Sequence, residues 1–185
     1  MGIYRPIQTK RIILRELEED DWSKLHSYLS DLEVQKYMIQ DATTPEQTKS
    51  YVRMFLEHKL EEPRRYVRFV ALLKEGEQLI GECGINMPNL KHSEGEIVYR
   101  FARPNWGKGY ASEVAGRMIK FGFEELSLHR IEALCDARNT ASIRVLDKLG
   151  MTREGCMREH RFVKGHWRDS VLYSILKHEF DTNKY

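Results

Sequence analysis

The sequence predicts a mixed β-sheet with helices on both faces, an α/β (α+β) architecture. Two β-rich runs, 66–73 and 78–85, flank a polar turn and predict an antiparallel hairpin. Strand and helix patterns then alternate over 94–149, which is typical of a β-α-β-α unit. Strand patterns near 151–162 and 167–177 predict a closing hairpin. With one early strand, these elements give a central sheet of about six or seven strands.

Length and composition indicate a single domain over residues 1–185. The 30 Lys and Arg residues nearly balance the 28 Asp and Glu residues and are mixed with them along the chain, which indicates a solvated surface rather than a nucleic-acid-binding face. A membrane span requires about 20 mostly apolar residues, and no stretch approaches that. Residues 1–12 lack the apolar core of a signal peptide. We therefore expect a cytoplasmic protein with no membrane partner and no direct nucleic-acid partner.

The three cysteines, Cys83, Cys135 and Cys156, are far apart and odd in number. This argues against a disulfide framework and fits a reducing compartment, where cysteines act as small buried apolar residues. Cys156 together with His160 and His166 makes only a loose match to a metal site, so we expect no metal.

The N-terminal half predicts one strand and a set of helices. A short β-rich run at 11–18 is followed by apolar residues at near-helical spacing over 22–32. Thr44 as N-cap and Gln47 closing a capping box then predict a helix that is stopped by Pro63.

The C-terminal half places strand and helix patterns around a glycine-rich turn. A strand at 94–102 precedes the turn, and apolar residues at helical spacing over 111–122 follow it. A strand at 130–135 and a helix at 140–149, ended by Gly150, come next.

The turn at 103–113 carries the clearest chemistry. Gly107 and Gly109 allow a tight bend and a close approach of the backbone to a ligand, and Lys108 adds a mobile cation. Successive amides in such a turn, together with the following helix N-terminus, form a concave anion site suited to a pyrophosphate. The alternative is an ordinary strand-to-helix turn. A dinucleotide fingerprint is disfavoured because Ser112 stands where it requires glycine.

Here the sequence resembles a known family. Residues 106–111, WGKGYA, are similar to the [QR]xxGx[GA] motif of the GNAT acetyltransferases, with Trp106 in place of Gln or Arg. The WGKGYA form resembles the RimJ/RimL branch, and the resemblance extends over roughly residues 9–180. Three more segments carry it: KRIILREL at 10–17, NTASIRVLDKLG at 139–150, and GHWRD at 165–169 with Tyr173.

The resemblance implies a GNAT fold and an acetyl-CoA-dependent N-acetyltransferase, with acetyl-CoA as co-substrate. It also implies that turn amides hold the pyrophosphate, that strand amides meet the pantetheine arm and thioester carbonyl in a gap between splayed strands, and that Asn139 bonds the arm. The alternative for Asn139 is a helix N-cap. The expected cofactor-binding residues are Arg100, Phe101, Ala102, Trp106, Gly107, Lys108, Gly109, Tyr110, Ala111, Asn139 and Ser142.

Acetyl transfer requires a neutral amine, so a base is useful. Glu96 is our candidate, since many relatives carry a glutamate there; the alternative is a solvated strand residue or an ion-pair partner. The family tyrosine that protonates the leaving thiolate is replaced by Leu146. Ser142 is the nearest substitute, and its alternative is a helix hydroxyl bonded back to the chain. Cys135 is a poorer candidate. A thiol of pKa about 8.5 leaves without much help, so the reaction does not require the tyrosine.

The resemblance leaves the acceptor amine open. RimJ/RimL relatives modify N-terminal α-amino groups of ribosomal proteins, and similar chains acetylate polyamines, aminoglycosides or other small amines. For this chain we expect direct attack of the amine in a ternary complex. Residues 31–63 and 155–167 are expected to decide among them. Two other classes remain as alternatives, a non-catalytic acyl-CoA-binding sensor and a nucleotide- or phosphate-binding regulator. The resemblance is compatible with a homodimer and leaves the oligomeric state open.

Three aromatic residues and Asp169 have simpler interpretations. Trp106, Trp167 and Tyr173 are candidates to line the cleft, although aromatic residues in strands more often belong to the core. We expect Asp169 to be structural and to hold the last hairpin.

Overall fold

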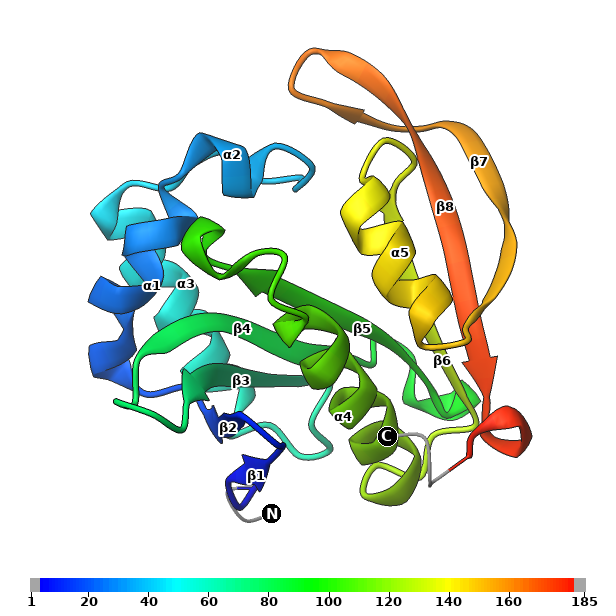
Figure 1. Ribbon diagram of the computed structural model, residues 1–185, viewed down its shortest axis with the longest axis horizontal. Helices are drawn as coiled ribbons and strands as arrows, with labels where there is room; N and C mark the ends of the chain where they lie inside the picture. Colours follow the sequence, from blue (N-terminus) through cyan, green and yellow to red (C-terminus); the bar gives the residue numbers. More distant parts are fainter. Residues whose placement is uncertain (1–3, 182–185) are drawn as a thin grey trace.

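The computed structural model describes residues 4–181 and shows a mixed sheet with helices on both faces (Figure 1). Within these residues the sheet has eight strands in the order β1-β2-β3-β4-β5-β6-β8-β7. The strands are β1 Ile7–Gln8, β2 Ile12–Glu16, β3 Tyr66–Leu73, β4 Leu79–Asn86, β5 Glu94–Phe101, β6 Arg130–Asp136, β7 Thr152–Val163 and β8 His166–Leu176. The predicted fold class is confirmed. The strand missing from the prediction is β1, whose two residues are too few to show a pattern.

Five α-helices are formed within residues 4–181. They are α1 Trp22–Leu29, α2 Leu32–Gln35, α3 Pro45–His58, α4 Tyr110–Glu124 and α5 Thr140–Lys148. The predicted capping box is confirmed, because the Thr44 hydroxyl accepts from the Gln47 amide at 3.2 Å and the Gln47 side chain accepts from the Thr44 amide at 2.8 Å. The helix ends earlier than predicted, at His58 rather than near Pro63.

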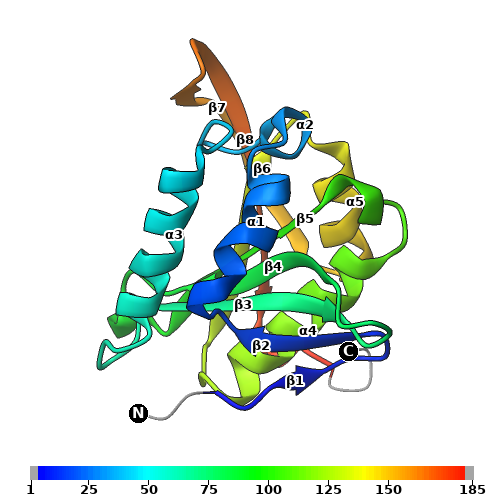
Figure 2. The ribbon, with the colours of Figure 1, turned by 90° about the vertical axis from the view of Figure 1, so that its left-hand side faces the viewer.

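The two faces of the sheet carry different helices and separate cores, as strand β3 illustrates. Phe69 faces the core formed with α4 and α5, whereas Val70 faces the core formed with α1 and α3. Figure 2 shows α1 and α3 side by side on the same face of the sheet. Because successive side chains of a strand point to opposite faces, the near-continuous apolar run of β3 supplies both cores.

Strands β5 and β6 form the one parallel pair of the described sheet, and they separate after three residues. Their pairing ends where Glu96 meets Glu132. Beyond that point β5 continues along β4, and β6 continues along β8. The sheet therefore opens between two adjacent strands, as the family resemblance predicted, and this opening positions the site.

The β7–β8 hairpin projects from the body of the molecule (Figure 1). Gly165 turns it with a φ of 79°, a left-handed conformation that favours glycine. The Asp169 carboxylate accepts from the Glu159 amide at 2.8 Å, next to an irregularity in the pairing between Met157 and Arg161. Asp169 thus holds the last hairpin, as expected.

Candidate active site

A cleft of about 610 Å³ begins where β5 and β6 separate. Its walls come from β5, β6, the loop before α4 and the first turn of α4, the first turns of α5, the segment around α2, and the β7–β8 hairpin. At one end lies the glycine turn with Gly107 and Gly109, and Glu96 lines the same cleft at the point where the strands part. The cleft therefore brings together most of the residues that the sequence singled out.

The glycine turn has the backbone geometry that the sequence predicted. Gly107 and Gly109 have φ angles of 74° and 79°, and Gly109 is the N-cap of α4. Trp106, which replaces the family's Gln or Arg, donates its indole N–H to the Phe101 carbonyl at 2.7 Å and so fixes the turn to the end of β5. The Lys108 side chain is exposed, whereas the glycines on either side of it line the cleft.

Three residues near the N-terminus or on α4 support this turn, and the sequence analysis did not assign them a role. Arg11 donates from Nη1 to the Lys108 carbonyl at 3.0 Å and from Nε to Glu113 at 2.8 Å. Its guanidinium also lies 4.5 Å from the centre of the Tyr110 ring. Thr9 donates to Glu113 at 2.6 Å. The KRIILREL and WGKGYA segments both belong to the family resemblance, but nothing in the sequence shows that they touch, and Glu113 lies just beyond the second of them.

Hydrogen bonds lower the pKa of Glu113. Desolvation acts to raise the pKa of this carboxyl, but bonds from Thr9 and from the Arg11 amide and side chain outweigh it. Glu113 is therefore a charged anchor that joins the first turn of α4 to the chain before β2.

The prediction that the backbone amides at the end of β5 all face the cofactor needs correction. The Ala102 amide donates to the Ile80 carbonyl at 2.9 Å, so it faces β4 and is not offered to the cleft. In an antiparallel ladder the amides of alternate residues point to opposite sides. The Arg100 amide therefore faces β4 as well, and the Phe101 and Tyr99 amides point toward the opening.

The Arg100 side chain forms a buried network beneath the cleft. Its guanidinium is ion-paired with Glu82, which also accepts from the Tyr51 hydroxyl at 2.8 Å. Nη1 of Arg100 donates to the Gln35 side chain at 3.1 Å. These bonds fasten the α2 segment, one wall of the cleft, to the sheet.

Glu96 is a half-buried carboxylate at the point where the strands separate. Burial raises its pKa, and the neighbouring Glu132 carboxylate raises it further, whereas Arg161 and the Asn86 side chain act in the opposite direction. A carboxyl group with a raised pKa is a better proton acceptor near neutral pH than an exposed one. The environment thus differs from that of the solvated strand residue that was the alternative.

Ser142 meets a residue that sequence reasoning missed. Its Oγ lies 2.8 Å from the hydroxyl of Tyr99, which is on β5 across the opening. Ser142 is therefore bonded across the cleft rather than back to its own helix. Leu146, at the position of the family tyrosine, is fully buried in the core. The bond between β5 and α5 is a tertiary contact that no sequence pattern indicated.

Asn139 is the N-cap of α5. Its Oδ1 accepts from the Ser142 amide at 3.1 Å, so the alternative given for this residue holds. Asn139 also lines the cleft, and its bond fixes the first turn of α5 beside the opening.

Several predictions about cysteines and aromatic residues need correction. Cys83 is buried as expected, but Cys135 lines the cleft and Cys156 is exposed because it lies on the edge strand β7. Trp167 is also exposed rather than part of the core, whereas the buried Tyr173 donates to Asp147 at 2.9 Å.

Residues 4–181 contain no group of three His, Cys, Asp or Glu residues placed to hold a metal ion. In the same part of the chain no helix is long and apolar enough to cross a membrane.

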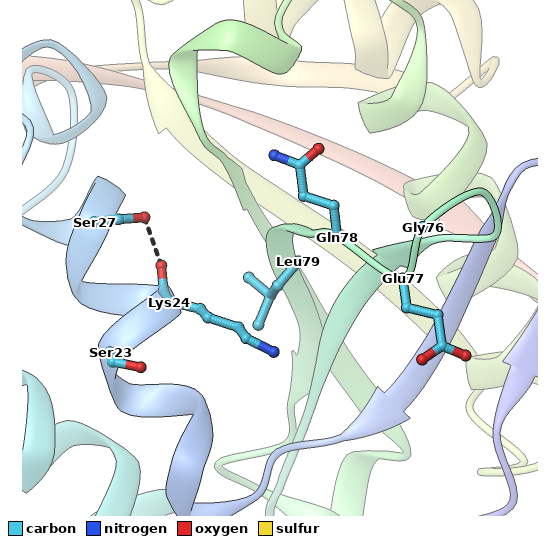
Figure 3. Close-up of a pocket in the computed structure, with 7 residues that line it drawn as sticks. All are labelled: Ser23, Lys24, Ser27, Gly76, Glu77, Gln78 and Leu79. Carbon is cyan, nitrogen blue, oxygen red and sulfur yellow. Dashed lines mark hydrogen bonds between the residues drawn. The ribbon is translucent and has the colours of Figure 1, made fainter.

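A second hollow, of about 530 Å³, lies between α1 and the turn joining β3 to β4 (Figure 3). Lys24 and Glu77 are its charged residues, and the Ser27 hydroxyl donates to the Lys24 carbonyl at 2.7 Å. It contains neither the glycine turn nor the strand opening, so we assign the chemistry to the first cleft.

Comparison with known proteins identifies the family. A family model described as an acetyltransferase (GNAT) domain matches residues 11–152. This chain belongs to the GNAT acetyltransferases. It is 38% identical to the uncharacterized N-acetyltransferase p20 of Bacillus licheniformis; the match spans 175 residues, which is 94% of this chain and 97% of that protein. The crystal structure of a GNAT-family acetyltransferase from Bacillus anthracis matches with a TM-score of 0.84 and 34% identity, covering 95% of this chain and 100% of that one.

A third relative has a stated acceptor. The spermidine N(1)-acetyltransferase of Escherichia coli is 25% identical over 170 residues, which is 90% of this chain and 87% of that protein. The GNAT membership makes this protein an acetyl-CoA-dependent acyltransferase that transfers to an amine. The positive-φ glycine turn and the strand opening fit a pyrophosphate and an extended arm within one cleft.

Proposed function

We propose that this GNAT enzyme acetylates the N-terminal α-amino group of a polypeptide, by direct attack of the amine on acetyl-CoA in a ternary complex. The observation that carries the proposal is Glu96. It is a carboxylate of raised pKa in the cleft that also holds the glycine turn, and it stands where the two strands part.

Backbone groups of the glycine turn and of β5 would bind acetyl-CoA. The amides around Gly107, Gly109 and Ala111, at the positive end of α4, suit the pyrophosphate. The free Phe101 amide suits the pantetheine arm or the thioester carbonyl, where a fixed donor stabilises developing negative charge. Asn139 lines the same path and would donate from its side-chain amide Nδ2, since its Oδ1 already accepts from the Ser142 amide.

Glu96 would accept the proton of the attacking amine, directly or through one water. An N-terminal α-amine has a pKa of about 7.7–8.0, against about 10.4 for a lysine. It is partly neutral at physiological pH, so a modest base suffices.

Charges at the acceptor end favour a single amine over a polycation. Arg161 lines the cleft on the side of the β7–β8 hairpin, and a polyamine would approach it at a cost in repulsion, whereas the buried Arg168 is already paired with Asp136. The RimJ/RimL character of the WGKGYA segment supports the same choice.

The second candidate for the acceptor is a polyamine. The likeness to the spermidine enzyme favours it, as does the acidic pair formed by Glu96 and Glu132. Acetyl-CoA and newly made N-termini occur together in the cytoplasm, which is where we place the enzyme.

Release of free coenzyme A thiol tests the proposal. The native protein would be assayed with peptides carrying free N-termini, the same peptides with blocked N-termini, spermidine and an aminoglycoside. We expect release only with the free peptides, loss of it in Gly109→Trp, and a reduction of about 100-fold or more in Glu96→Gln. Turnover of spermidine alone would favour the second candidate. Tight binding of acetyl-CoA with no transfer to any amine would indicate a sensor.

A further inference from the structure

Arg161 differs from the other arginines of the cleft because it has no partner. Its side chain is half-buried and lines the cleft, yet it forms no hydrogen bond or ion pair with any residue of 4–181. Arg100 and Arg168 also line the cleft and are both ion-paired, whereas Arg144 is exposed on α5. A cation partly removed from water without a partner is costly, so this position suits an anionic group supplied by a ligand.

Arg161 lies at the acceptor end of the cleft, near the candidate base. Its positive charge acts to lower the pKa of Glu96, so the two side chains face each other across the cleft. Glu96 and Phe101 are five residues apart on β5, which is roughly 17 Å along the strand. The glycine turn follows Phe101, so the anion that Arg161 would bind is not the pyrophosphate of coenzyme A.

The tip of the β7–β8 hairpin holds Arg161 over the cleft. Lys164, three residues further on, donates from Nζ to the Gln35 carbonyl at 2.8 Å and lies 3.5 Å from Asp41 Oδ1. Gln35 is itself fixed, since its side chain donates to the Leu29 carbonyl at 2.9 Å. The hairpin and the α2 segment are thus bonded to each other, and the backbone that carries Arg161 is positioned before an acceptor binds.

A carboxylate is the anion that best fits Arg161. The planar guanidinium can bind a carboxylate through two parallel hydrogen bonds. Arg68, the other cation that acts on Glu96, already donates to the Asn86 side chain at 3.1 Å. The Glu132 carboxylate repels a second anion from the β6 side, so the carboxylate of an acceptor would lie toward the hairpin.

We propose that Arg161 binds an acidic side chain in the first two residues of the acceptor polypeptide, so that the enzyme prefers N-termini with Asp or Glu at one of these positions. The inference rests on the proposed function and narrows its substrate class. The α-amine reaches Glu96 while the carboxylate, at most two residues away along the chain, reaches Arg161. Arg161 thereby determines specificity and takes no part in the transfer of the acetyl group.

Release of coenzyme A thiol with a matched peptide series tests the proposal. The peptides have free N-termini and differ only at position one or two, where Asp or Glu is compared with Asn or Gln of the same shape. We expect kcat/KM of the native enzyme to be about tenfold or more higher for the acidic peptide at one of these positions. Arg161→Gln should bring this ratio near one, and Arg161→Lys should keep part of it, because an ammonium cannot form the paired bonds.

The ratio separates recognition from any effect on the base. Loss of Arg161 also changes the pKa of Glu96, but that change affects the acidic and the neutral peptide alike. Arg158→Gln is the matched control and should keep the native ratio, because Arg158 is an exposed arginine of the same strand that does not line the cleft. Arg161→Glu should reverse the preference and favour Lys over Gln at the sensitive position.

Binding provides a readout that does not depend on turnover. Titration calorimetry of the peptides into the complex with coenzyme A, which has no acetyl group to transfer, should give the same ratio in Kd. The Kd for coenzyme A itself should be equal in the native protein and in Arg161→Gln, and a large rise in the variant would place Arg161 on the cofactor and overturn the proposal. Equal turnover of acidic and neutral peptides would also overturn it, while leaving N-terminal acetylation in place. No acetylation of any free peptide, the acidic ones included, would contradict the proposed function and this inference together.

Discussion

Arg11 and Glu113 join the start of the described sheet to the helix that follows the glycine turn. Arg11 Nη2 lies 2.7 Å from Glu113 Oε2, and the Arg11 amide donates to the same carboxylate at 2.8 Å. Because Arg11 also donates to the Lys108 carbonyl, one side chain holds both the turn and the first turn of α4. A surface ion pair alone contributes little to stability. The value of this arrangement lies in fixing the turn before the pyrophosphate binds.

Replacing Arg11 should therefore weaken cofactor binding more than folding. Arg11→Met keeps a side chain of similar apolar length, but it loses the side-chain bonds to Lys108 and Glu113 and the contact of the guanidinium with the Tyr110 ring. We expect the Kd for coenzyme A to rise about fivefold, which corresponds to roughly 1 kcal/mol. Titration calorimetry measures this, and thermal unfolding serves as the control. An unchanged Kd would show that the turn keeps its shape without the arginine.

The left-handed backbone conformation of Gly109 predicts that a side chain at this position destabilises the protein. A Cβ there would have no neighbour closer than Arg11 at 3.6 Å, so the cost of Gly109→Ala comes from its φ of 79° rather than from a clash. We expect a loss of about 1–2 kcal/mol in the free energy of unfolding, together with weaker coenzyme A binding. Gly155→Ala is the matched control, because a Cβ there meets nothing within 4 Å and its φ is not positive. Equal stability of the two variants would contradict the argument.

Two substitutions of neighbouring residues should shift the pKa of Glu96 in opposite directions. Glu132→Gln removes a like charge and should lower the Glu96 pKa, whereas Arg161→Gln removes a cation and should raise it. Carbon-13 NMR titration of the carboxyl groups, with Glu96→Gln to assign the signal, measures both shifts. Shifts of the same sign in the two variants would show that burial or a structural change controls the group.

The same pKa affects activity and stability. A base must be ionised, so kcat should fall as the pH drops through the Glu96 pKa, and Glu132→Gln should move that fall to lower pH. Because the folded pKa lies above the unfolded value, ionised Glu96 destabilises the fold at neutral pH. Glu96→Gln should therefore be more stable than the native protein at pH 7. This difference should shrink as the pH falls from the raised folded pKa to the ordinary glutamate pKa, below which Glu96 is protonated in both the folded and the unfolded state. Denaturant unfolding at pH 7 and pH 4 measures it.

Local patterns predicted the elements, and tertiary contacts decided the site. The capping box of α3 and the glycine turn depend on residues close in sequence, so both could be read directly. The bonds Tyr99–Ser142 and Arg11–Glu113 join residues 43 and 102 positions apart, and no spacing rule connects them. The Ala102 amide was misassigned because which amides face the opening depends on the register of β5 on β4.

Which cysteines are exposed also depends on tertiary structure, and their exposure gives the last prediction. Composition treated all three cysteines as buried, but the strand order leaves Cys156 on an edge and Cys135 at the cleft. Burial is the main cause that raises the pKa of Cys135 to about 11, so roughly one thiol in ten thousand is ionised at pH 7.

Iodoacetamide should therefore modify the exposed Cys156 first. In Cys156→Ser, the modification of Cys135 should be slow, should speed up as the pH rises toward 10, and should slow again when coenzyme A is bound, because Cys135 lines the cofactor cleft. Peptide mass spectrometry over time measures both sites. Fast modification of Cys135 at pH 7, or modification indifferent to coenzyme A, would place its thiol outside the cleft.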